Sequence, residues 1–347
     1  MDTDFMTKKT AGQLLAGDET VVADAYENFN LQPVDLDLTN QATRPVRTQQ
    51  KTIAEAITLS GHGTFARKST STITFEPTDR EGWWLNRTDQ PDCLPIKVAI
   101  DNVWTTGSII SNIVLRAGGP HNYVRMVEHL IALRMGLDVD NLMIQMDSGD
   151  PPLFARGSRD LIEALERAGR RAVNRPVKYV TVKEPVTLAR SGGQFLTLAP
   201  HTGNGVPKLT IDAAVDFPNA IGRQRIIFPV NYTTLLSGAE ARTNTSYAKM
   251  LYCKTIGKIF ADIRHLGYTD ENILIARKRR YHNQPRLIFD GKSLEAAWHR
   301  GVLDLLAAVA LIPNGLFVGE ITSYKAGHRI DCDMITQLYL KDLLTEI

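Results

Sequence analysis

The chain has few cysteines, no long apolar run and no strong excess of charge of either sign. Its three cysteines, Cys93, Cys253 and Cys332, are odd in number and far apart in a chain of 347 residues. Such usage fits neither a disulfide framework nor a cysteine-based zinc site, and it is typical of a protein in a reducing compartment. We therefore expect a cytoplasmic protein.

Two further absences narrow the class of partner. No uninterrupted apolar run reaches the roughly 18 residues of a membrane span, and the acidic, mixed N-terminus lacks the apolar stretch of a signal peptide. A net charge of +2 gives no general attraction to nucleic acid. The one basic cluster, residues 277–280, has no repeated aromatic platform around it, so we interpret it as a solvated loop. We expect a small-molecule substrate.

What the chain does contain is an ordinary hydrophobic content of 43%, and its length allows two domains. Residues 1–48 are polar, and we expect a flexible extension with a short helix over residues 14–29, which offers a site for a protein partner. Residues 49–175 and 176–347 repeat a pattern of strands and helices. We predict an α+β fold with two similar sheet-on-helix domains facing each other and the active site in the cleft between them.

The helices that matter for function are predicted from apolar residues at helical spacing. They cover residues 123–137, 247–266, 294–311 and 333–344. The first and third carry the residues with the most distinctive chemistry. Those residues are adjacent Glu128 and His129 in the first helix, and His299 with Asp304 in the third.

Two histidines and a carboxylate can hold a zinc ion and leave a position open for water. His129, His299 and Asp304 supply that donor set, and Glu128 stands beside a ligand, where a glutamate can take a proton from the water. The chain is therefore a candidate metal-dependent hydrolase.

These motifs, together with others in a fixed order, resemble the UDP-3-O-acyl-N-acetylglucosamine deacetylase family, the zinc enzymes of lipid A biosynthesis. The resemblance runs from about residue 51 to the C-terminus. The segments that carry it are Lys51-Thr52-Ile53, Ser60-Gly61-His62-Gly63, Val127-Glu128-His129-Leu130, Asp216-Phe217-Pro218, Ala241-Arg242-Thr243 and Tyr324-Lys325-Ala326-Gly327-His328. Each segment alone is a weak signal, and their shared order makes the resemblance specific for the fold.

The resemblance implies a role for each matching residue. It implies zinc ligands at His129, His299 and Asp304, a general base at Glu128, an oxyanion donor at Thr243, an acid for the leaving amine at His328, and substrate contacts from Lys325, Arg300 and Asn244. Lys325 would face a substrate phosphate, and Asn244 stands where the family has a phenylalanine that packs on substrate. The implied reaction removes an acetyl or acyl group from an N-acylated, nucleotide-linked amino sugar or a related amide.

One spacing departs from the family pattern. The family has the second histidine and the aspartate four residues apart on one helix, whereas His299 and Asp304 are five apart. Five residues turn an ideal helix by about 500°, which leaves the two side chains roughly 140° apart. Either a π-bulge near Gly301 rebuilds the site, or the site has decayed and His299 or Arg300 faces solvent.

A second departure leaves the same alternatives open. Ala308 stands where the family has a carboxylate that helps to orient the acid, and Asp331 or Asp333 could replace that carboxylate. The alternative hypothesis is a catalytically decayed member that binds a sugar nucleotide or a protein partner without hydrolysis.

Overall fold

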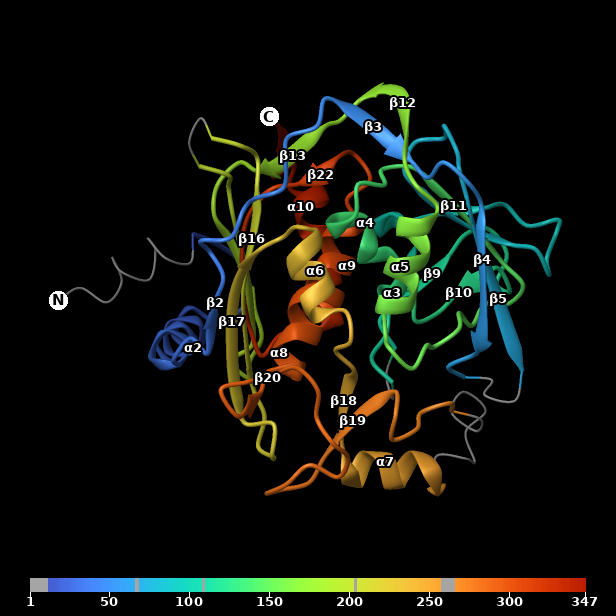
Figure 1. Ribbon diagram of the computed structural model, residues 1–347. Helices are drawn as coiled ribbons and strands as arrows, with labels where there is room; N and C mark the ends of the chain where they lie inside the picture. The colour runs from blue at the N-terminus through green and yellow to red at the C-terminus, as the bar shows by residue number, and fades with distance from the viewer. Residues whose placement is uncertain (1–11, 66–68, 108–109, 203–204, 257–265) are drawn as a thin grey trace.

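The computed structural model describes residues 12–65, 69–107, 110–202, 205–256 and 266–347. It is a mixed structure of sheets and helices, which confirms the predicted α+β class. Two large sheets lie on opposite sides of a central group of helices, and a further helix covers the outer face of one sheet (Figure 1).

The larger sheet has seven strands. In spatial order they are β1 (Gln13–Ala16), β14 (Val186–Ala189), β15 (Phe195–Ala199), β23 (Gly319–Tyr324), β16 (Leu209–Asp216), β17 (Arg223–Pro229) and β2 (Leu36–Asp37). Pairing is parallel between β1 and β14, between β16 and β23, and between β17 and β2, and antiparallel elsewhere. Both edge strands therefore come from the N-terminal segment of the chain.

The N-terminal segment is built into the fold, so the prediction of a flexible extension is wrong for residues 13–37. The helix α2 (Glu19–Leu31) begins after Asp18, whose carboxylate accepts hydrogen bonds from the Thr20 and Val21 amides. Its apolar face covers the outer face of the seven-stranded sheet, where Tyr26 stacks on Phe195 with ring centroids 4.1 Å apart. The predicted short helix is confirmed, and residues 1–11 lie outside the described part of the chain.

The second large sheet has five strands. In spatial order they are β4 (Ile57–His62), β5 (Thr70–Glu76), β11 (Leu142–Met146), β6 (Trp83–Arg87) and β7 (Ile96–Lys97). Burial alternates along β5, as expected for a sheet with one face on the core. The remaining small sheets are β8 (Val103–Thr105) with β9 (Val114–Arg116) and β10 (Tyr123–Val124), β3 (Gln49–Thr52) with β12 (Arg171–Pro176), β13 (Tyr179–Val182) with β22 (Leu316–Phe317) and β24 (Leu344–Glu346), β18 (Thr243–Ser246) with β19 (Ile273–Ala276), and β20 (Ile288–Phe289) with β21 (Lys292–Ser293).

The helices differ in detail from the predicted ranges. Besides α2, the residues that the structure describes form the short 3₁₀ turn η1 (Ile100–Asn102), α3 (Glu128–Ile131), α4 (Leu133–Gly136), α5 (Arg159–Arg167), α6 (Tyr232–Gly238), α7 (Tyr247–Lys254), α8 (Glu295–His299), the π-helical turn η4 (Arg300–Leu305), α9 (Leu306–Ala310) and α10 (His328–Leu340). The first predicted helix starts late because residues 123–124 pair with β9 instead. The last predicted helix starts early, at His328, and the predicted helix over residues 247–266 includes residues 257–265, which lie outside the described part.

One hydrophobic core runs through both predicted halves of the chain. The helix α9 is buried along its whole length and packs against α3 and α4, and all three contribute to the same apolar cluster. The division into two domains at residue 175 remains a prediction. In the part of the chain that the structure describes, no helix has both the length and the apolar character needed to cross a membrane.

Candidate active site

A π-helical turn decides how His299 and Asp304 lie. Helix α8 runs into the π turn η4 and then into α9, so that the three form one continuous helix. The wider turn absorbs one extra residue and brings His299 Nδ1 to 3.3 Å from Asp304 Oδ1. His299 and Arg300 are both buried, so the hypothesis that either one faces solvent is wrong. The five-residue spacing is compatible with a shared site.

Glycine is required inside this turn by close packing. A Cβ on Gly301 would lie 2.8 Å from the ring of Phe228 on the neighbouring sheet. Real Cβ atoms are rarely so close to another heavy atom, and both the ring and the helix are buried, so neither has room to move. Gly301 therefore lets the π turn rest directly on β17.

The first helix contributes a buried carboxylate and an imidazole whose two nitrogens are buried. Glu128 Oε2 accepts a hydrogen bond from the Ile113 amide at 3.1 Å, and burial raises the pKa of Glu128 against the opposing influence of His328. Both ring nitrogens of His129 are buried and have no hydrogen-bond partner. Burial, with a further contribution from His299, lowers the pKa of His129 to about 3, so its imidazole is neutral near pH 7.

His328 joins the two helices at the start of α10. Its Nε2 lies 3.5 Å from Asp304 Oδ1 and 3.9 Å from Glu128 Oε1. Its side chain is buried, and its Nδ1 has no hydrogen-bond partner. His328 thus lies between the predicted base and one predicted metal ligand.

Thr243 approaches from a different element. It is the first residue of β18, and its Oγ1 lies 3.0 Å from His299 Nε2. The preceding residue, Arg242, forms a buried ion pair with Glu295 at 2.6 Å, and its backbone amide donates to the same carboxylate. Because Glu295 is the first residue of α8, this pair fixes Thr243 relative to the helix that carries His299.

Asp304 is ionised in spite of its burial. Burial alone would raise its pKa, but His328, His299 and Arg300 lie close and together hold the pKa well below its usual range. Its Oδ1 accepts no hydrogen bond of ordinary geometry, although two histidine nitrogens lie within 3.5 Å. The carboxylate is therefore negative and mostly buried, and its Oδ1 lacks a hydrogen bond.

The predicted substrate contacts are less uniform. Arg300 is not available to a substrate, because its guanidinium is buried and binds Asp331 and Ser323; that prediction is corrected. Asn244 lies in β18, partly buried, next to Thr243. Lys325 is exposed at the end of β23. It lines a hollow of about 360 Å³ between α2 and the sheet, and no candidate metal ligand lines that hollow.

The candidate ligands fit zinc in kind. Among the residues that the structure describes, no three His, Cys, Asp or Glu side chains already enclose a position for a metal ion. His129, His299 and Asp304 nevertheless offer two imidazoles and a carboxylate, the donor set of many catalytic zinc sites. His129 is the strongest indication of an ion, because buried nitrogens without a hydrogen-bond partner are rare.

Several residues that shape the site were not predicted to do so. Arg242, Glu295, Ser323 and Asp331 are buried and fix the elements that carry Thr243, His299 and His328. The sequence indicates Asp331 only as one of two replacements for a missing carboxylate. Its position three residues after His328 was the one signal in the sequence.

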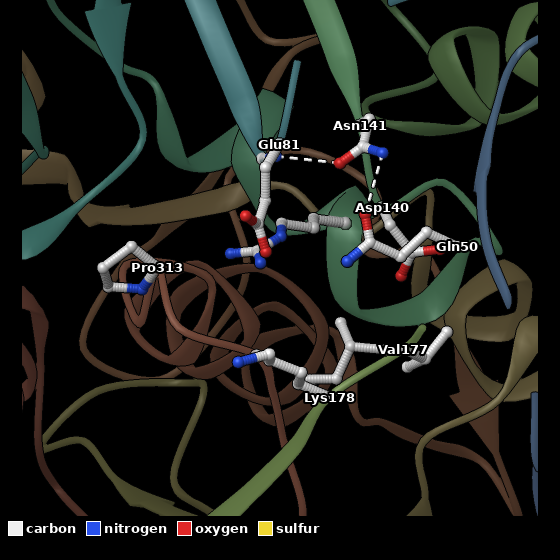
Figure 2. A pocket seen from close by; sticks show the side chains of 11 residues that line it. Gln50, Glu81, Asp140, Asn141, Val177, Lys178 and Pro313 are labelled. Atoms are coloured by element: carbon white, nitrogen blue, oxygen red, sulfur yellow. Dashed lines mark hydrogen bonds between the residues drawn. The ribbon is translucent and has the colours of Figure 1, made fainter. Parts of the chain in front are cut away.

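A small cavity lies away from the candidate active site. It measures about 20 Å³, room for about one water molecule, and is lined by Gln50, Asp140, Asn141 and their neighbours. Figure 2 shows the Asn141 side chain at its edge, where it donates to Gln50 Oε1 at 2.9 Å and accepts from the Gly82 amide at 2.8 Å. The side-chain amides of Asn141 and Gln50 bond to each other here, and the cavity is too small for a substrate.

Comparison with known proteins gives a consistent result. The family model described as UDP-3-O-acyl N-acetylglycosamine deacetylase matches residues 50–340. The chain is 30% identical over 292 residues to the UDP-3-O-acyl-N-acetylglucosamine deacetylase of Bdellovibrio bacteriovorus, a match that covers 84% of this chain and 89% of that protein. It is 25% identical over 300 residues to the protein of the same name from Brucella ovis, covering 86% of this chain and 98% of that protein.

Proposed function

The chain belongs to the UDP-3-O-acyl-N-acetylglucosamine deacetylase family, and from that premise we propose that it is a zinc-dependent amide hydrolase. Its substrate class is an N-acylated amino sugar linked to a nucleotide, as in the names of its relatives, and its pathway is lipid A biosynthesis. The observation that carries the proposal is a continuous series of contacts through buried and partly buried side chains. They are Glu128, His328, Asp304, His299 and Thr243, with the His129 ring centroid 6.0 Å from that of His299.

The metal would be held by His129, His299 and Asp304. When bound there, zinc polarises the amide carbonyl and lowers the pKa of its water. The low pKa of His129 keeps its imidazole neutral, which is the form that binds metal. The ionised Asp304 supplies negative charge against the cation.

Glu128 is suited to take a proton from the attacking water. It is buried beside the candidate ligands, and its raised pKa brings its basicity closer to neutral pH. Its second oxygen is fixed by the Ile113 amide, which limits the rotation of the carboxylate. Glu128 can therefore present one oxygen to the water throughout the reaction.

His328 and Thr243 complete the proposed chemistry. His328 Nε2, between Glu128 and Asp304, would give a proton to the nitrogen of the leaving amine as the C–N bond breaks. The Thr243 hydroxyl would donate a hydrogen bond to the carbonyl oxygen as it gains negative charge. Asn244 and Lys325 are proposed to contact the substrate outside the reacting amide.

The test measures metal and chemistry separately. Zinc content is determined by plasma mass spectrometry for the wild type, His129→Ala, His299→Ala and a control, His121→Ala, at an exposed histidine. Release of acetate and free amine from UDP-3-O-acyl-N-acetylglucosamine is followed in the same samples. We expect about one zinc per chain in the wild type and the control, loss of zinc in both site variants, and loss of hydrolysis with it.

Two other outcomes would contradict the proposal. A wild type that takes up no zinc after zinc is supplied, and releases no amine, favours the decayed, binding-only alternative. Hydrolysis that survives the loss of zinc would remove the metal from the mechanism.

A further inference from the structure

All three guanidinium nitrogens of Arg300 are hydrogen-bonded in the candidate active site. Its Nη1 and Nη2 each lie 2.5 Å from one oxygen of Asp331, and its Nε donates to Ser323 Oγ at 3.0 Å. Arg300 and Asp331 have relative exposures of 2% and 0%. The guanidinium therefore connects the π turn to α10 and to β23.

Arg300 also reaches the candidate metal ligand on its own helix. Its Nη1 lies 3.5 Å from Asp304 Oδ2, while Oδ1 of the same carboxylate faces His299 and His328. The two oxygens of Asp304 thus have different surroundings. One faces a permanent cation, and the other faces the histidines of the site.

Arg300 lies at the start of the π turn, where the directions of successive side chains change from those of a regular helix. It is the first residue of the π turn and lies four residues before Asp304, whereas His299 lies five before it. A regular helix would direct Arg300 to Asp304 and turn His299 away by roughly 140°. With the π turn, both side chains reach Asp304, one at each oxygen.

We infer that Arg300 is a positioning residue for the metal site: it holds the π turn and turns Asp304 so that Oδ1 alone is presented to the histidines. Asp331 neutralises Arg300 and ties the start of α10, with His328, to the same turn. This inference rests on the proposed function, since it assigns Arg300 to the geometry of the proposed zinc ligands. Groups that orient ligands in this way typically change metal affinity by about 10- to 100-fold.

A purely structural role predicts a different behaviour. Replacing both members of a buried ion pair by apolar residues of similar volume is often neutral for folding, because the desolvation of two charges is removed with their attraction. The double variant Arg300→Met/Asp331→Leu therefore separates the two roles. If the pair only supports the fold, the variant keeps its metal site.

The experiment compares this variant with a matched pair outside the site. The control is Arg47→Met/Asp140→Leu, which removes a buried pair at 2.6 Å that no candidate ligand contacts. Zinc dissociation constants are measured by chelator competition, with Tm, kcat and KM in parallel. The absorption spectrum of the cobalt-substituted proteins reports how many ligands hold the metal.

We expect the Arg300→Met/Asp331→Leu protein to fold, to bind zinc about 10- to 100-fold more weakly, and to lose kcat with little change in KM. Its cobalt spectrum should differ from the wild type, while the control keeps both affinity and spectrum. Arg300→Lys retains the charge without the paired donors, so its zinc affinity should also fall.

The outcomes that overturn the inference are distinct from failure of the proposed function. If the double variant keeps the zinc affinity and cobalt spectrum of the wild type, the inference is wrong. If the double variant does not fold, a wild-type zinc affinity in Arg300→Lys overturns the inference instead. A wild type that binds no zinc overturns the proposed function, and the inference with it.

Discussion

Two groups of charged side chains, one around Asp140 and one around Asp304, differ in how completely their carboxylates are hydrogen-bonded. Around Asp140 every contact is short: Arg47 donates to both carboxylate oxygens at 2.6 and 2.9 Å, and the Lys51 amide donates at 2.7 Å. Around Asp304 the contacts measure 3.3 to 3.5 Å, and Oδ1 accepts no regular hydrogen bond. The Asp140 carboxylate is held by short hydrogen bonds within the chain, whereas Asp304 Oδ1 has no hydrogen bond, which is the condition that the proposed metal ligand requires.

The largest expected effect is a loss of catalysis when Glu128, in the group around Asp304, is replaced. Glu128→Gln keeps the volume of the side chain but removes the base, so kcat should fall by about 100- to 10,000-fold, or roughly 3–5 kcal/mol in the barrier. Folding should be little affected, because the Ile113 amide can still donate to the amide oxygen. Steady-state kinetics with Glu55→Gln, an exposed control, measures the difference. A Glu128→Gln protein with the wild-type rate excludes Glu128 as the base.

The second effect is a loss of stability when the group around Asp140 is disrupted. Asp140→Leu removes two hydrogen bonds from the buried Arg47 guanidinium and one from the Lys51 amide, and Asp138 remains as a carboxylate beside Arg47. The free energy of unfolding should therefore fall by about 3 kcal/mol, the lower end for a broken buried pair. Urea unfolding followed by circular dichroism gives this value. The kcat of the folded fraction should stay near the wild-type value, because no candidate catalytic residue contacts Asp140. A fall in kcat without loss of stability would reverse the roles assigned to the two groups.

The third and smallest effect is a pH dependence of the metal-free protein. The pKa of His129 is about 3 in the folded chain and about 6.5 when unfolded, so the unfolded state binds more protons between these values. The stability linked to His129 is complete above pH 6.5 and is lost as the pH falls toward 3, by about 1.4 kcal/mol per pH unit.

Chemical unfolding in the presence of a chelator, from pH 7 to pH 4.5, measures this slope. His129→Gln should flatten it, and His121→Gln at an exposed site should leave it unchanged. An equal slope in the wild type and His129→Gln would mean that His129 does not resist protonation in the folded chain.

The sequence predicted which residues would lie together in the site, but not the helix geometry that brings them together. The order of the motifs around Glu128, His129, Thr243 and His328 was enough to bring these side chains to one site. The sequence alone does not decide the geometry of His299 and Asp304, because regular helical periodicity separates the two side chains. The π turn is held by Arg300 through Asp331 and Ser323, which are more than 20 residues away in the chain, and local sequence does not encode such contacts.

The N-terminal segment was misjudged for a different reason. Its polar composition indicated disorder, and β1 and β2 are only four and two residues long, too short for a periodic pattern. The signal for α2 was present in Asp18 as a cap and in apolar residues at helical spacing, from Val22 to Phe29. The sequence does not show which strands β1 and β2 pair with, because those strands follow more than 150 residues later.

The N-terminal segment forms both borders of the seven-stranded sheet, so it covers the edges of β14 and β17 that could otherwise pair with another molecule. A chain shortened to residue 50, where the family match begins, would lose β1, β2 and α2 together. The backbone amides and carbonyls of β14 and β17 would then be free to pair with another molecule, and Phe195 and Tyr324 would be exposed to water. Such a chain would be prone to aggregate through its sheet edges, even with the buried site intact.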